Sequence, residues 1–372
     1  MLKVLIISKA FVGGVYHKKL EELARLGVTL HLAVPDRWGT HKLEIAESRA
    51  YQIHPLKIFF NGKNHFHFYA GLSDLIERVG PDILHVDEEH YILVTYQAMR
   101  LAKNIKAKAI FFTWQNIYKR YPFPFSYIEQ YNFNAADVAI AGNEEARDVL
   151  RRKGFKKEIA VIPQLGVDPD IFKRTNSCGS GDKPTFKDEQ FTIGYMGRLV
   201  EEKGVLTLVE AVSEAQEHCK LLIIGSGPLR KDILSSAEKF RIGSRVEIID
   251  WVSSSEVPSY LNRLDCLVLP SLTTRRWKEQ FGRVLIEAMA CEVPVIGSDS
   301  GEIPRVIDDA GLVFREGDVD ELKDKINKLI NDAALRDELM QRGRGRVLRT
   351  YTQKRIALET FKVYEFLMDK EL

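Results

Sequence analysis

Short apolar segments alternate with helical ones along most of this chain, and this alternation restricts the fold more than any other feature. In the first half, the runs KVLIIS, VTLHLAVP, DILHVDE, AKAIFFTW and ADVAIAG are separated by stretches of helical periodicity. One such stretch places Tyr16, Leu20, Leu23 and Ala24 on one helix face. Strands that alternate with helices predict an α/β fold with a parallel, doubly wound sheet.

The same pattern restarts after a stretch without periodicity. Residues 164–190, QLGVDPDIFKRTNSCGSGDKPTFKDEQ, are rich in Gly, Pro, Ser and Asp, as is typical of a linker. Beyond it, FTIGYM, KLLIIG, VEIID, CLVLP and VPVIGS each precede a turn and a helix. We therefore predict two Rossmann-like domains, residues 1–165 and 191–350, joined by a linker over 166–190.

Residues 351–372 predict one amphipathic helix, with Ala357, Phe361, Tyr364 and Met368 on its apolar stripe. An apolar stripe must dock on another part of the protein. Ligands of doubly wound domains bind outside the carboxyl ends of the strands. We expect the two domains to face each other across a cleft into which the Gly-rich strand ends point.

Composition excludes several other classes of protein. The 372 residues suffice for two cores, and a net charge of +2 creates no field that attracts nucleic acid. The cysteines, at positions 178, 219, 266 and 291, form no CxxC pair, which indicates reduced thiols in a cytoplasmic protein. Lys9 interrupts the N-terminal apolar run, and no stretch reaches the roughly 18 apolar residues of a membrane span.

The segment GRLVEEKG, residues 197–204, follows a predicted strand and precedes a helix. Its glycines allow close backbone approach, and a helix N-terminus favours anions. Arg198 and Lys203 add two cations suited to phosphate oxygens, although a surface turn with solvated charges would show the same residues.

Two glutamates, Glu279 and Glu287, bracket the segment EQFGRVLIE. If residues 281–290 are helical, the two carboxylates lie about 12 Å apart along the axis, too far to share one atom. They suit the two ends of an extended ligand, because a carboxylate accepts hydrogen bonds from a diol. Backbone amides of Phe281, Gly282 and Arg283 suit a diphosphate between them. A nucleotide-sugar has this layout.

Several motifs resemble those of glycosyltransferase family 4, and they occur in the family's usual order. Members of this family are retaining enzymes of the GT-B fold. The segment EQFGRVLIEAMACEVPVIGSDSGEIPRVI is similar to the family's Glu-x7-Glu signature, and GRLVEEKG to its basic phosphate loop. IIGSGP resembles the following strand and turn, FVGGV the glycine loop, and LHVDEEHY the HxHE strand end. The resemblance spans nearly the whole chain.

The resemblance implies roles for individual residues of the second domain. Arg198 and Lys203 would bind the donor diphosphate, Glu279 the hydroxyls of the transferred sugar, and Glu287 the ribose hydroxyls. The remaining donor-binding residues would act mainly through their backbone: Gly13 and Gly14 on the phosphate, Gly225 in the turn of IIGSGP, and Val252 in the turn that receives the base. The C-terminal helix would cross back to the first domain.

On the acceptor side the chain departs from the family. Many members carry a His after the strand that corresponds to IFFTWQN, but here Trp114 is followed by Gln115, which cannot act as a general base. Asp87, Glu88 and Glu89 at the neighbouring strand end are alternative carboxylates, and a solvated acidic loop is an equally good explanation of them.

No cofactor or metal is expected. Two Asp-x-Asp pairs occur, at 168–170 in the linker region and at 318–320, where the first Asp is placed to cap a helix. His65 and His67 have no accompanying ligand cluster. Arg198, Lys203 and helix amides would neutralise the departing diphosphate instead.

The acceptor is not defined by the sequence, and a glycan, a lipid-linked glycan and a small molecule all stay open. Two basic-aromatic segments, KIFFNGKNHFHFYAGL and IYKRYPFPFSYIEQYNF, either pack into the core, which we favour slightly, or form a peripheral surface at the inner face of a membrane. The leading hypothesis is a metal-independent, retaining hexosyltransferase that uses a UDP-, GDP- or ADP-sugar. A nucleotide-sugar epimerase and a non-catalytic nucleotide-sugar-binding subunit are the alternatives.

Overall fold

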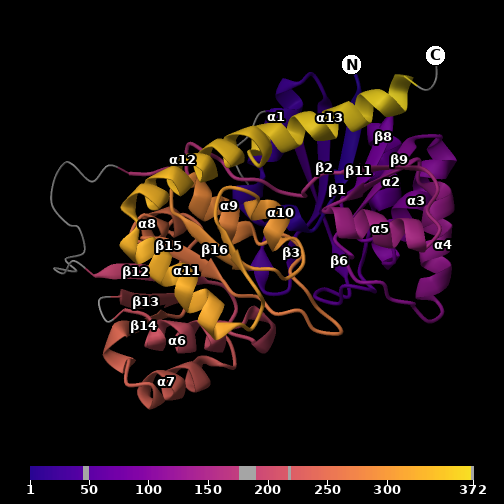
Figure 1. The fold of residues 1–372 in the computed structure, drawn as a ribbon. Coiled ribbons are helices and arrows are strands. Elements are labelled where there is room, and N and C mark those ends of the chain that lie inside the picture. The colour runs from indigo at the N-terminus through magenta and orange to yellow at the C-terminus, as the bar shows by residue number, and fades with distance from the viewer. Residues whose placement is uncertain (45–49, 176–189, 217–218, 370–372) are drawn as a thin grey trace. The chain divides into compact units, whose positions relative to one another are not determined.

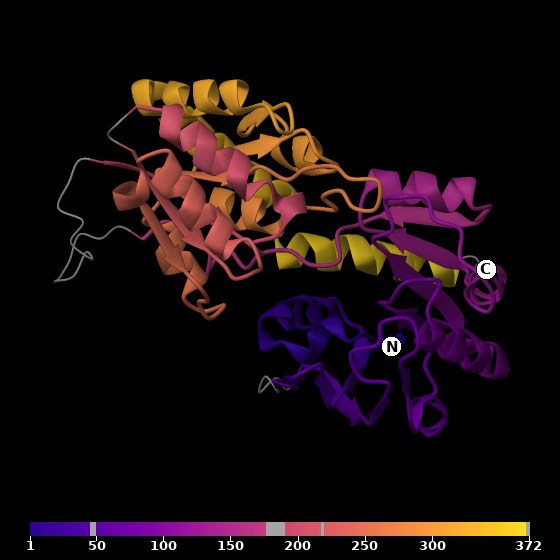
Figure 2. The ribbon, with the colours of Figure 1, turned by 90° about the horizontal axis from the view of Figure 1, so that it is seen from below.

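The structure, a computed structural model, describes residues 1–44, 50–175, 190–216 and 219–369. The chain divides into two compact units, which we describe separately. Unit 1 comprises Met1–Gly166 together with Gln353–Leu372, and unit 2 comprises Val167–Thr352. Each unit holds a parallel sheet flanked by helices (Figures 1 and 2). Of the linker expected over residues 166–190, positions 176–189 lie outside the described residues.

Unit 1 is built on a seven-stranded sheet in the order β11-β10-β9-β8-β1-β2-β5, and every neighbouring pair is parallel. The strands are β1 (Lys3–Ile7), β2 (Thr29–Pro35), β5 (Gln52–Leu56), β8 (Ile83–Val86), β9 (Lys108–Thr113), β10 (Val138–Ala141) and β11 (Glu158–Val161). From β1 the chain runs outward through β2 and β5, and later outward in the other direction from β8. The strand order therefore reverses between β1 and β8, as a doubly wound sheet requires.

Helices cover both faces of this sheet, because alternate strand residues point to opposite sides. Leu5 and Ile7 pack with α2 (Leu72–Val79), α3 (Leu93–Ile105), α4 (Phe125–Ala135) and α5 (Glu144–Arg152). Val4 and Ile6 pack on the other face with α1 (Lys18–Arg25) and α13 (Gln353–Asp369). The first helix begins later than its periodicity suggested, since Tyr16 belongs to the short 3-10 turn η2 (Gly14–Tyr16).

Smaller elements complete unit 1. They are the 3-10 turn η1 (Ala10–Val12) and the antiparallel pairs β3 (Arg37–Trp38) with β4 (His41–Lys42) and β6 (Ile58–Phe59) with β7 (Phe68–Tyr69).

Unit 2 holds a six-stranded parallel sheet in the order β14-β13-β12-β15-β16-β17. The strands are β12 (Phe191–Met196), β13 (Cys219–Ile224), β14 (Val246–Ile249), β15 (Cys266–Leu269), β16 (Val295–Ser298) and β17 (Leu312–Phe314). The order reverses between β12 and β15. The helices are α6 (Val205–Glu214), α7 (Arg230–Lys239), α8 (Val257–Leu261), α9 (Arg283–Ala290), α10 (Ile303–Ile307), α11 (Val319–Asn331) and α12 (Ala333–Thr350), with 3-10 turns η3 (Glu201–Lys203) and η4 (Gly243–Arg245).

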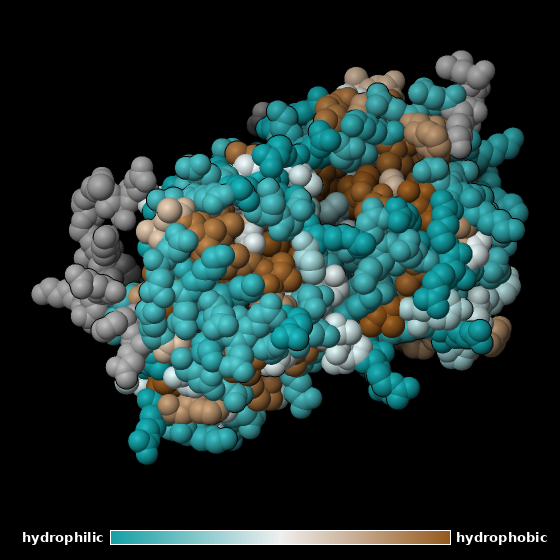
Figure 3. Space-filling view, viewed as in Figure 1, coloured by the Kyte–Doolittle hydropathy of each residue, from teal (hydrophilic) through white to brown (hydrophobic). Residues whose placement is uncertain are grey.

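The C-terminal helix α13 packs against α1 in unit 1. Ala357 and Tyr364 of the expected stripe are fully buried, whereas Phe361 and Met368 are only partly buried. The Tyr364 hydroxyl lies 2.7 Å from Nδ1 of His85, in the middle of the sheet. Residues of β10, β11 and α13 line a cavity of about 290 Å³. Figure 3 shows hydrophobic residues gathered beside the helix.

Among the residues that the structure describes, no helix is long and apolar enough to cross a bilayer.

Candidate active site

The predicted donor residues of unit 2 gather where its strand order reverses. The chain leaves β12 at Gly197 and Arg198, and leaves β15 at Pro270 and Ser271. Since β12 and β15 are parallel neighbours, both turns lie at the same edge of the sheet. We call this edge the strand reversal of unit 2. Doubly wound domains bind their ligands at the edge where the strand order reverses.

Lys203 and Glu279 are in direct contact at this edge. The Lys203 ammonium lies 2.5 Å from Oε2 of Glu279, and their side chains are only 15% and 9% exposed. The Ser271 hydroxyl donates a hydrogen bond of 2.8 Å to the same oxygen. The ring of Trp277 lies 4.8 Å from the Lys203 ammonium, within range of a cation–π contact. Sequence reasoning nominated the Lys and the Glu but missed Ser271 and Trp277.

The backbone of Glu279 is held by the turn after β16. Its carbonyl oxygen accepts a hydrogen bond of 3.1 Å from the Glu302 N–H. Gly301 has a φ of +57°, and a Cβ there would lie 2.0 Å from the same carbonyl oxygen. Only glycine fits this close approach. The predicted sugar-binding carboxylate is thus fixed through both its side chain and its main chain.

The turns that follow β12 and β13 lie directly against each other. Gly225 has a φ of +151°, and a Cβ at this position would lie 1.8 Å from the Gly197 carbonyl oxygen. The Leu199 N–H donates to the Ser226 carbonyl at 2.9 Å. The turn of Gly225 therefore lies against the turn that follows β12, and its role in donor binding stays a prediction. Val252 lies in the irregular segment after β14, next to Trp251, whose side chain is 76% exposed.

Glu287 lies on α9 and is almost fully buried. Its Oε1 accepts a hydrogen bond of 2.6 Å from Nε of Arg283, one helical turn earlier. Burial raises the pKa of Glu287, and the charge and hydrogen bond of Arg283 lower it in part. The helix begins at Arg283, after Gly282 in the left-handed conformation, so it starts two residues later than the span of 281–290 considered from the sequence. Phe281 is buried, with its ring edge-on to Tyr351.

Arg198 differs from the other predicted donor residues in its exposure. Its side chain is 64% exposed and lies 3.5 Å from the Glu202 carboxylate. Its carbonyl oxygen accepts a hydrogen bond of 2.7 Å from the buried Tyr195 hydroxyl, which fixes the turn. The guanidinium is therefore at the surface of the strand reversal and not within it.

In unit 1 the predicted acceptor-side residues lie at the carboxyl ends of β8 and β9. Asp87 is buried, and its Oδ2 accepts hydrogen bonds from Ser8 (2.9 Å) and Gln164 (3.0 Å). Its Oδ1 has no hydrogen-bond partner among the described residues. Burial raises the pKa of Asp87 to about 6, although the nearby charge of Lys19 favours the ionised form. A solvated acidic loop does not describe this buried carboxyl group.

Glu88 is also buried, and it accepts a hydrogen bond of 2.8 Å from the Lys9 N–H and pairs with the Lys9 ammonium. The Trp114 indole N–H donates to Oε1 of Gln164 at 3.0 Å, so that Gln164 links Trp114 to Asp87. Gln164, near the end of the first segment of unit 1, was not predicted from the sequence.

Gln115 is buried, and its amide nitrogen donates to the Tyr121 hydroxyl at 2.8 Å. Its Oε1 has no hydrogen-bond partner among the described residues. An unpaired buried oxygen is costly and indicates a place for a hydrogen-bond donor.

Gly13 and Gly14 lie in the two 3-10 turns after β1. The Gly14 N–H donates a hydrogen bond of 2.8 Å to the Glu44 carboxylate. The Gly14 amide was predicted to bind phosphate, and in this structure it donates to a carboxylate instead.

Within the described ranges, no group of three or more His, Cys, Asp and Glu side chains is arranged to hold a metal ion. Asp318 caps α11 as expected, since its side chain accepts from the Glu321 N–H at 2.9 Å. Asp168 accepts from the Asp170 N–H at 3.0 Å within a turn. The described cysteines, Cys219, Cys266 and Cys291, are buried free thiols, and Cys178 lies outside the described residues.

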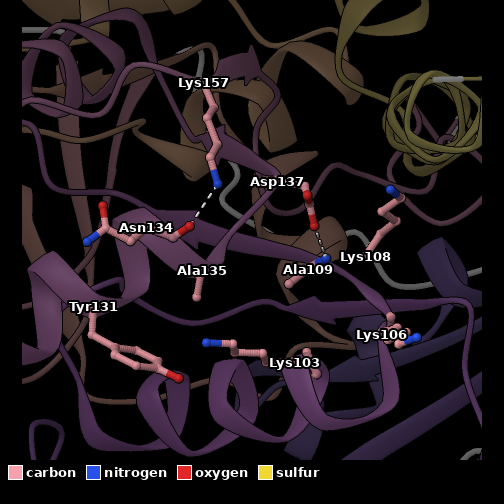
Figure 4. A pocket seen from close by; sticks show the side chains of 11 residues that line it. Lys103, Lys106, Lys108, Ala109, Tyr131, Asn134, Ala135, Asp137 and Lys157 are labelled. Atoms are coloured by element: carbon pink, nitrogen blue, oxygen red, sulfur yellow. Dashed lines mark hydrogen bonds between the residues drawn. The ribbon is translucent and has the colours of Figure 1, made fainter. Parts of the chain in front are cut away.

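A cavity of about 550 Å³ lies at the opposite edge of the unit 1 sheet, where β9, β10 and β11 begin. Figure 4 shows Lys103, Lys106, Lys108 and Lys157 around it. The Lys157 ammonium donates to the Asn134 carbonyl at 2.8 Å, at the C-terminus of α4. Lysines at helix C-termini stabilise the exposed carbonyl groups. We therefore assign this cavity no part in the site.

Two family models match the chain, one in each half, and together they cover most of it. "Glycosyltransferase Family 4" matches residues 15–171, and "Glycosyl transferases group 1" matches residues 181–346. The chain is 34% identical over 251 residues to the capsular polysaccharide biosynthesis glycosyltransferase CapM of Staphylococcus aureus. This alignment covers 64% of this chain and 64% of CapM, so the chain spans just under two thirds of that relative.

Solved glycosyltransferases share the fold over its whole length. Sucrose-phosphate synthase from Thermosynechococcus elongatus superposes with a TM-score of 0.76 at 19% identity, covering 100% of both chains. The Anabaena protein HepE, in complex with UDP and glucose, superposes with a TM-score of 0.69 at 16% identity, covering 98% of this chain and 100% of HepE. Motif order, the two parallel sheets and both family models agree, and this chain is a glycosyltransferase of family 4.

Proposed function

We propose that this glycosyltransferase transfers a hexose from a nucleoside-diphosphate sugar to a hydroxyl acceptor, with retention of configuration and without a metal ion. The observation that carries the proposal is the contact between Lys203 and Glu279 at the strand reversal of unit 2. A buried ion pair adds little net stability compared with apolar residues of the same volume. Its position at a ligand-binding edge therefore favours a role in binding.

In this proposal, donor binding replaces Glu279 by the diphosphate as the partner of Lys203. The diphosphate attracts the ammonium away from Glu279, because its oxygens offer a charge-assisted contact of at least equal strength. Oε2 of Glu279, still held by Ser271, is then available to the hydroxyls of the sugar. Arg198 and the N-terminus of α9 add positive potential for the departing diphosphate. These cations take the role that a metal ion plays elsewhere.

The proposed stereochemistry rests mainly on the resemblance to family 4, whose members retain configuration, and the absence of a base at Gln115 agrees with it. Inverting transfer needs a general base, and Gln115 cannot accept a proton. We propose front-face attack, in which the acceptor oxygen bonds to the anomeric carbon as the bond to the diphosphate breaks, and the acceptor proton passes to the diphosphate. Asp87 and Glu88 orient the acceptor hydroxyl in this proposal. An α-linked donor then gives an α-linked product.

The relatives support a choice of first substrates. HepE in complex with UDP and glucose supports UDP-glucose as the first donor to test, and the name of CapM supports a glycan hydroxyl as acceptor. We propose a cytoplasmic location, which the free thiols of Cys219, Cys266 and Cys291 support because thiols persist in a reducing compartment.

The first experiment is calorimetric titration with UDP, GDP and ADP, followed by the same titration of Lys203→Ala. Losing a charged contact to the diphosphate weakens binding by about 2–4 kcal/mol. Lys323→Ala is the matched control, because Lys323 is paired with Asp320 and with Glu214 at the C-terminal end of α6, whereas Lys203 precedes the N-terminal end of that helix. Equal affinity of Lys203→Ala and the parent chain would refute the assigned diphosphate contact.

The second experiment reads the product. Proton NMR of the early transfer product gives the anomeric coupling, and a β-linkage from an α-linked donor contradicts the proposed mechanism. Incubation with donor alone separates the rival function, since an epimerase converts the nucleotide-sugar into an isomer without any acceptor.

A further inference from the structure

Four phenylalanines of unit 1 have large exposed surfaces. Phe59, Phe60 and Phe66, in and between β6 and β7, are 42%, 61% and 51% exposed, and Phe123, shortly before α4, is 82% exposed. The expectation that these basic-aromatic segments pack into the core therefore holds only for some of their residues. Tyr69, for example, is buried. Gathered exposed apolar residues mark an interaction surface more often than isolated ones do.

Ring contacts connect the two segments, whose elements β6 and α4 are labelled in Figure 1. Phe59 stacks on Phe68 at 4.9 Å between ring centroids, and Phe60 lies 6.1 Å from the same ring. Phe66 packs edge-to-face against Phe125, the first residue of α4, at 5.1 Å. Phe68 and Phe125 are half-buried and hold the exposed rings outward.

The turn that carries these rings is compact. The Lys63 N–H donates to the Phe60 carbonyl at 2.9 Å, and the Phe66 N–H donates to the Lys63 carbonyl at 3.0 Å. The rings are therefore presented by a hydrogen-bonded turn, which reduces the conformational entropy that binding would cost.

Cations accompany the exposed rings. The Lys57 ammonium lies 5.6 Å from the centre of the Phe59 ring, and Lys63, Lys119 and Arg120 are exposed in the same two loops. In sequence, residues 50–73 and 90–128 contain no Asp or Glu at all. The charge carried by these two segments is consequently positive.

Two of the carboxylates that border these segments, Glu89 and Glu129, are engaged with other groups, whereas Asp74 at the start of α2 is exposed. Glu89 accepts hydrogen bonds from the Thr113 hydroxyl at 2.5 Å and the Trp114 N–H at 2.9 Å. Glu129 lies 3.0 Å from Nε2 of His90 and 2.5 Å from the Lys153 ammonium. Their charges are thus largely balanced within unit 1.

We infer that this surface docks on an anionic lipid bilayer. We call it the aromatic rim and define it as Phe59, Phe60, Phe66 and Phe123 with Lys57, Lys63, Lys119 and Arg120. Phenyl rings enter the boundary between head groups and acyl chains, while Lys and Arg bind anionic head groups. The rings stand on a hydrogen-bonded turn beside exposed cations, which suits insertion into an anionic bilayer better than capture of a peptide.

The inference goes beyond the proposed transfer chemistry and is independent of it. One consequence rests on the proposed function: docking narrows the acceptor to a hydroxyl presented at a membrane surface, because a docked chain meets lipid-linked acceptors at a high local concentration. The rim residues contribute nothing to the proposed donor contacts of unit 2.

Vesicle co-sedimentation of the full chain tests the inference. One vesicle set is phosphatidylcholine, and in the other about a third of the lipid is phosphatidylglycerol. We expect binding to the anionic vesicles that weakens as salt rises. Lys63→Gln/Arg120→Gln lowers the partition coefficient about 30-fold, at about fivefold per charge near the surface. Phe60→Ala/Phe66→Ala lowers it at least about tenfold.

Matched controls replace exposed charged and exposed apolar side chains of unit 2. Lys328→Gln/Arg349→Gln removes the same charge from exposed positions of unit 2, and Leu234→Ala/Leu348→Ala removes side chains that are 41% and 46% exposed. These controls retain vesicle binding. Melting temperature and nucleotide affinity stay unchanged in the rim variants, which separates lost docking from misfolding and from failure of the donor site.

Three results would overturn the inference: no preference of the parent chain for anionic vesicles, undiminished binding by the rim variants, or equal losses in the controls. A change of oligomeric state in the rim variants, measured by light scattering, would identify the rim as an interface between copies of the chain instead.

Discussion

Glu279 and Glu287 are almost equally buried, but they have different cationic partners. Glu279 contacts Lys203, which lies 76 positions earlier in the chain, whereas Glu287 is paired with Arg283 on its own helix. The first pair depends on the tertiary structure, and the second follows from helical spacing. This difference separates the effects expected from replacing each glutamate.

We predict that Glu287→Ala and Glu279→Ala fail at different steps. Loss of a hydrogen bond between a charged carboxylate and the ribose costs about 1.5–3 kcal/mol. Glu287→Ala therefore lowers the affinity for the free nucleotide. Glu279→Ala leaves nucleotide affinity undiminished, because Lys203 loses a competing partner, while transfer collapses. Calorimetry and single-turnover assays measure the two effects, and equal losses of nucleotide affinity would contradict the assigned roles.

Asp87 provides a prediction about pH. Its ordinary pKa is near 3.8, and burial raises the pKa to about 6 in the folded chain. Between these values the folded state binds more protons than the unfolded state, so the contribution of Asp87 to stability falls as pH rises from about 4 to 6. His85 acts in the opposite direction, because burial lowers its pKa to about 3 and its contribution falls as pH drops below about 6.5.

Comparison with Asp87→Asn isolates the carboxyl group from His85. The free energy of unfolding of the parent chain minus that of the variant should decline by about 2 kcal/mol between pH 4 and pH 7. Denaturant titrations at several pH values measure this difference. A difference that is constant over the range would contradict a raised pKa for Asp87.

At the scale of elements, the turns after parallel strands decide the shape of the candidate site. The turns after β12 and β13 touch through backbone atoms, and Gly225 permits the contact. Neighbouring parallel strands bring their carboxyl ends to one edge, so their turns compete for the same space. Because glycine has no side chain, the two turns can lie in contact, and their backbone amides stay near the edge of the sheet.

We predict that Gly225→Ala destabilises unit 2 by about 3 kcal/mol or more and abolishes nucleotide binding, because the new Cβ overlaps the Gly197 carbonyl. Gly27→Ala is the control: Gly27 has a φ of +90° but open space around it. This variant carries only the conformational cost of about 1 kcal/mol. Thermal unfolding and calorimetry measure both, and similar losses in the two variants would exclude the steric explanation.

At the scale of the whole molecule, the chain returns to unit 1 after it has completed unit 2. Helix α13 covers one face of the first sheet with Ile356, Ala357, Val363 and Tyr364. The Tyr364 hydroxyl also satisfies a ring nitrogen of the buried His85. The last helix in sequence is therefore part of the first core.

We predict that Tyr364→Ala destabilises unit 1 selectively, by about 3–5 kcal/mol, as large-to-small changes of a buried aromatic do. Hydrogen exchange should accelerate in β1 and β8 and stay slow in β12 and β15. Phe366→Ala, on the same helix but 37% exposed, is the control with little effect. Faster exchange in the second sheet alone would contradict the assignment of α13 to unit 1.

The sequence by itself determined the fold class and the candidate site residues. The central strands are apolar on both sides because helices cover both faces, and this local pattern predicted parallel sheets correctly. The spacing from Glu279 to Glu287 and the segment around Lys203 nominated a donor site, whose assigned roles stay predictions.

Only the tertiary structure decided which residues meet. Of the edge strands that the structure describes in the two large sheets, β5, β11 and β17 escaped prediction, whereas β14 was predicted from its apolar run VEIID. An edge strand has one neighbour, so its sequence needs a less apolar pattern than a central strand. Ser271 and Trp277 beside Lys203, and Gln164 beside Asp87, had no signal in the sequence. Hydrophobic periodicity records burial along one element, whereas contacts between strand ends depend on strand order, which no local pattern encodes.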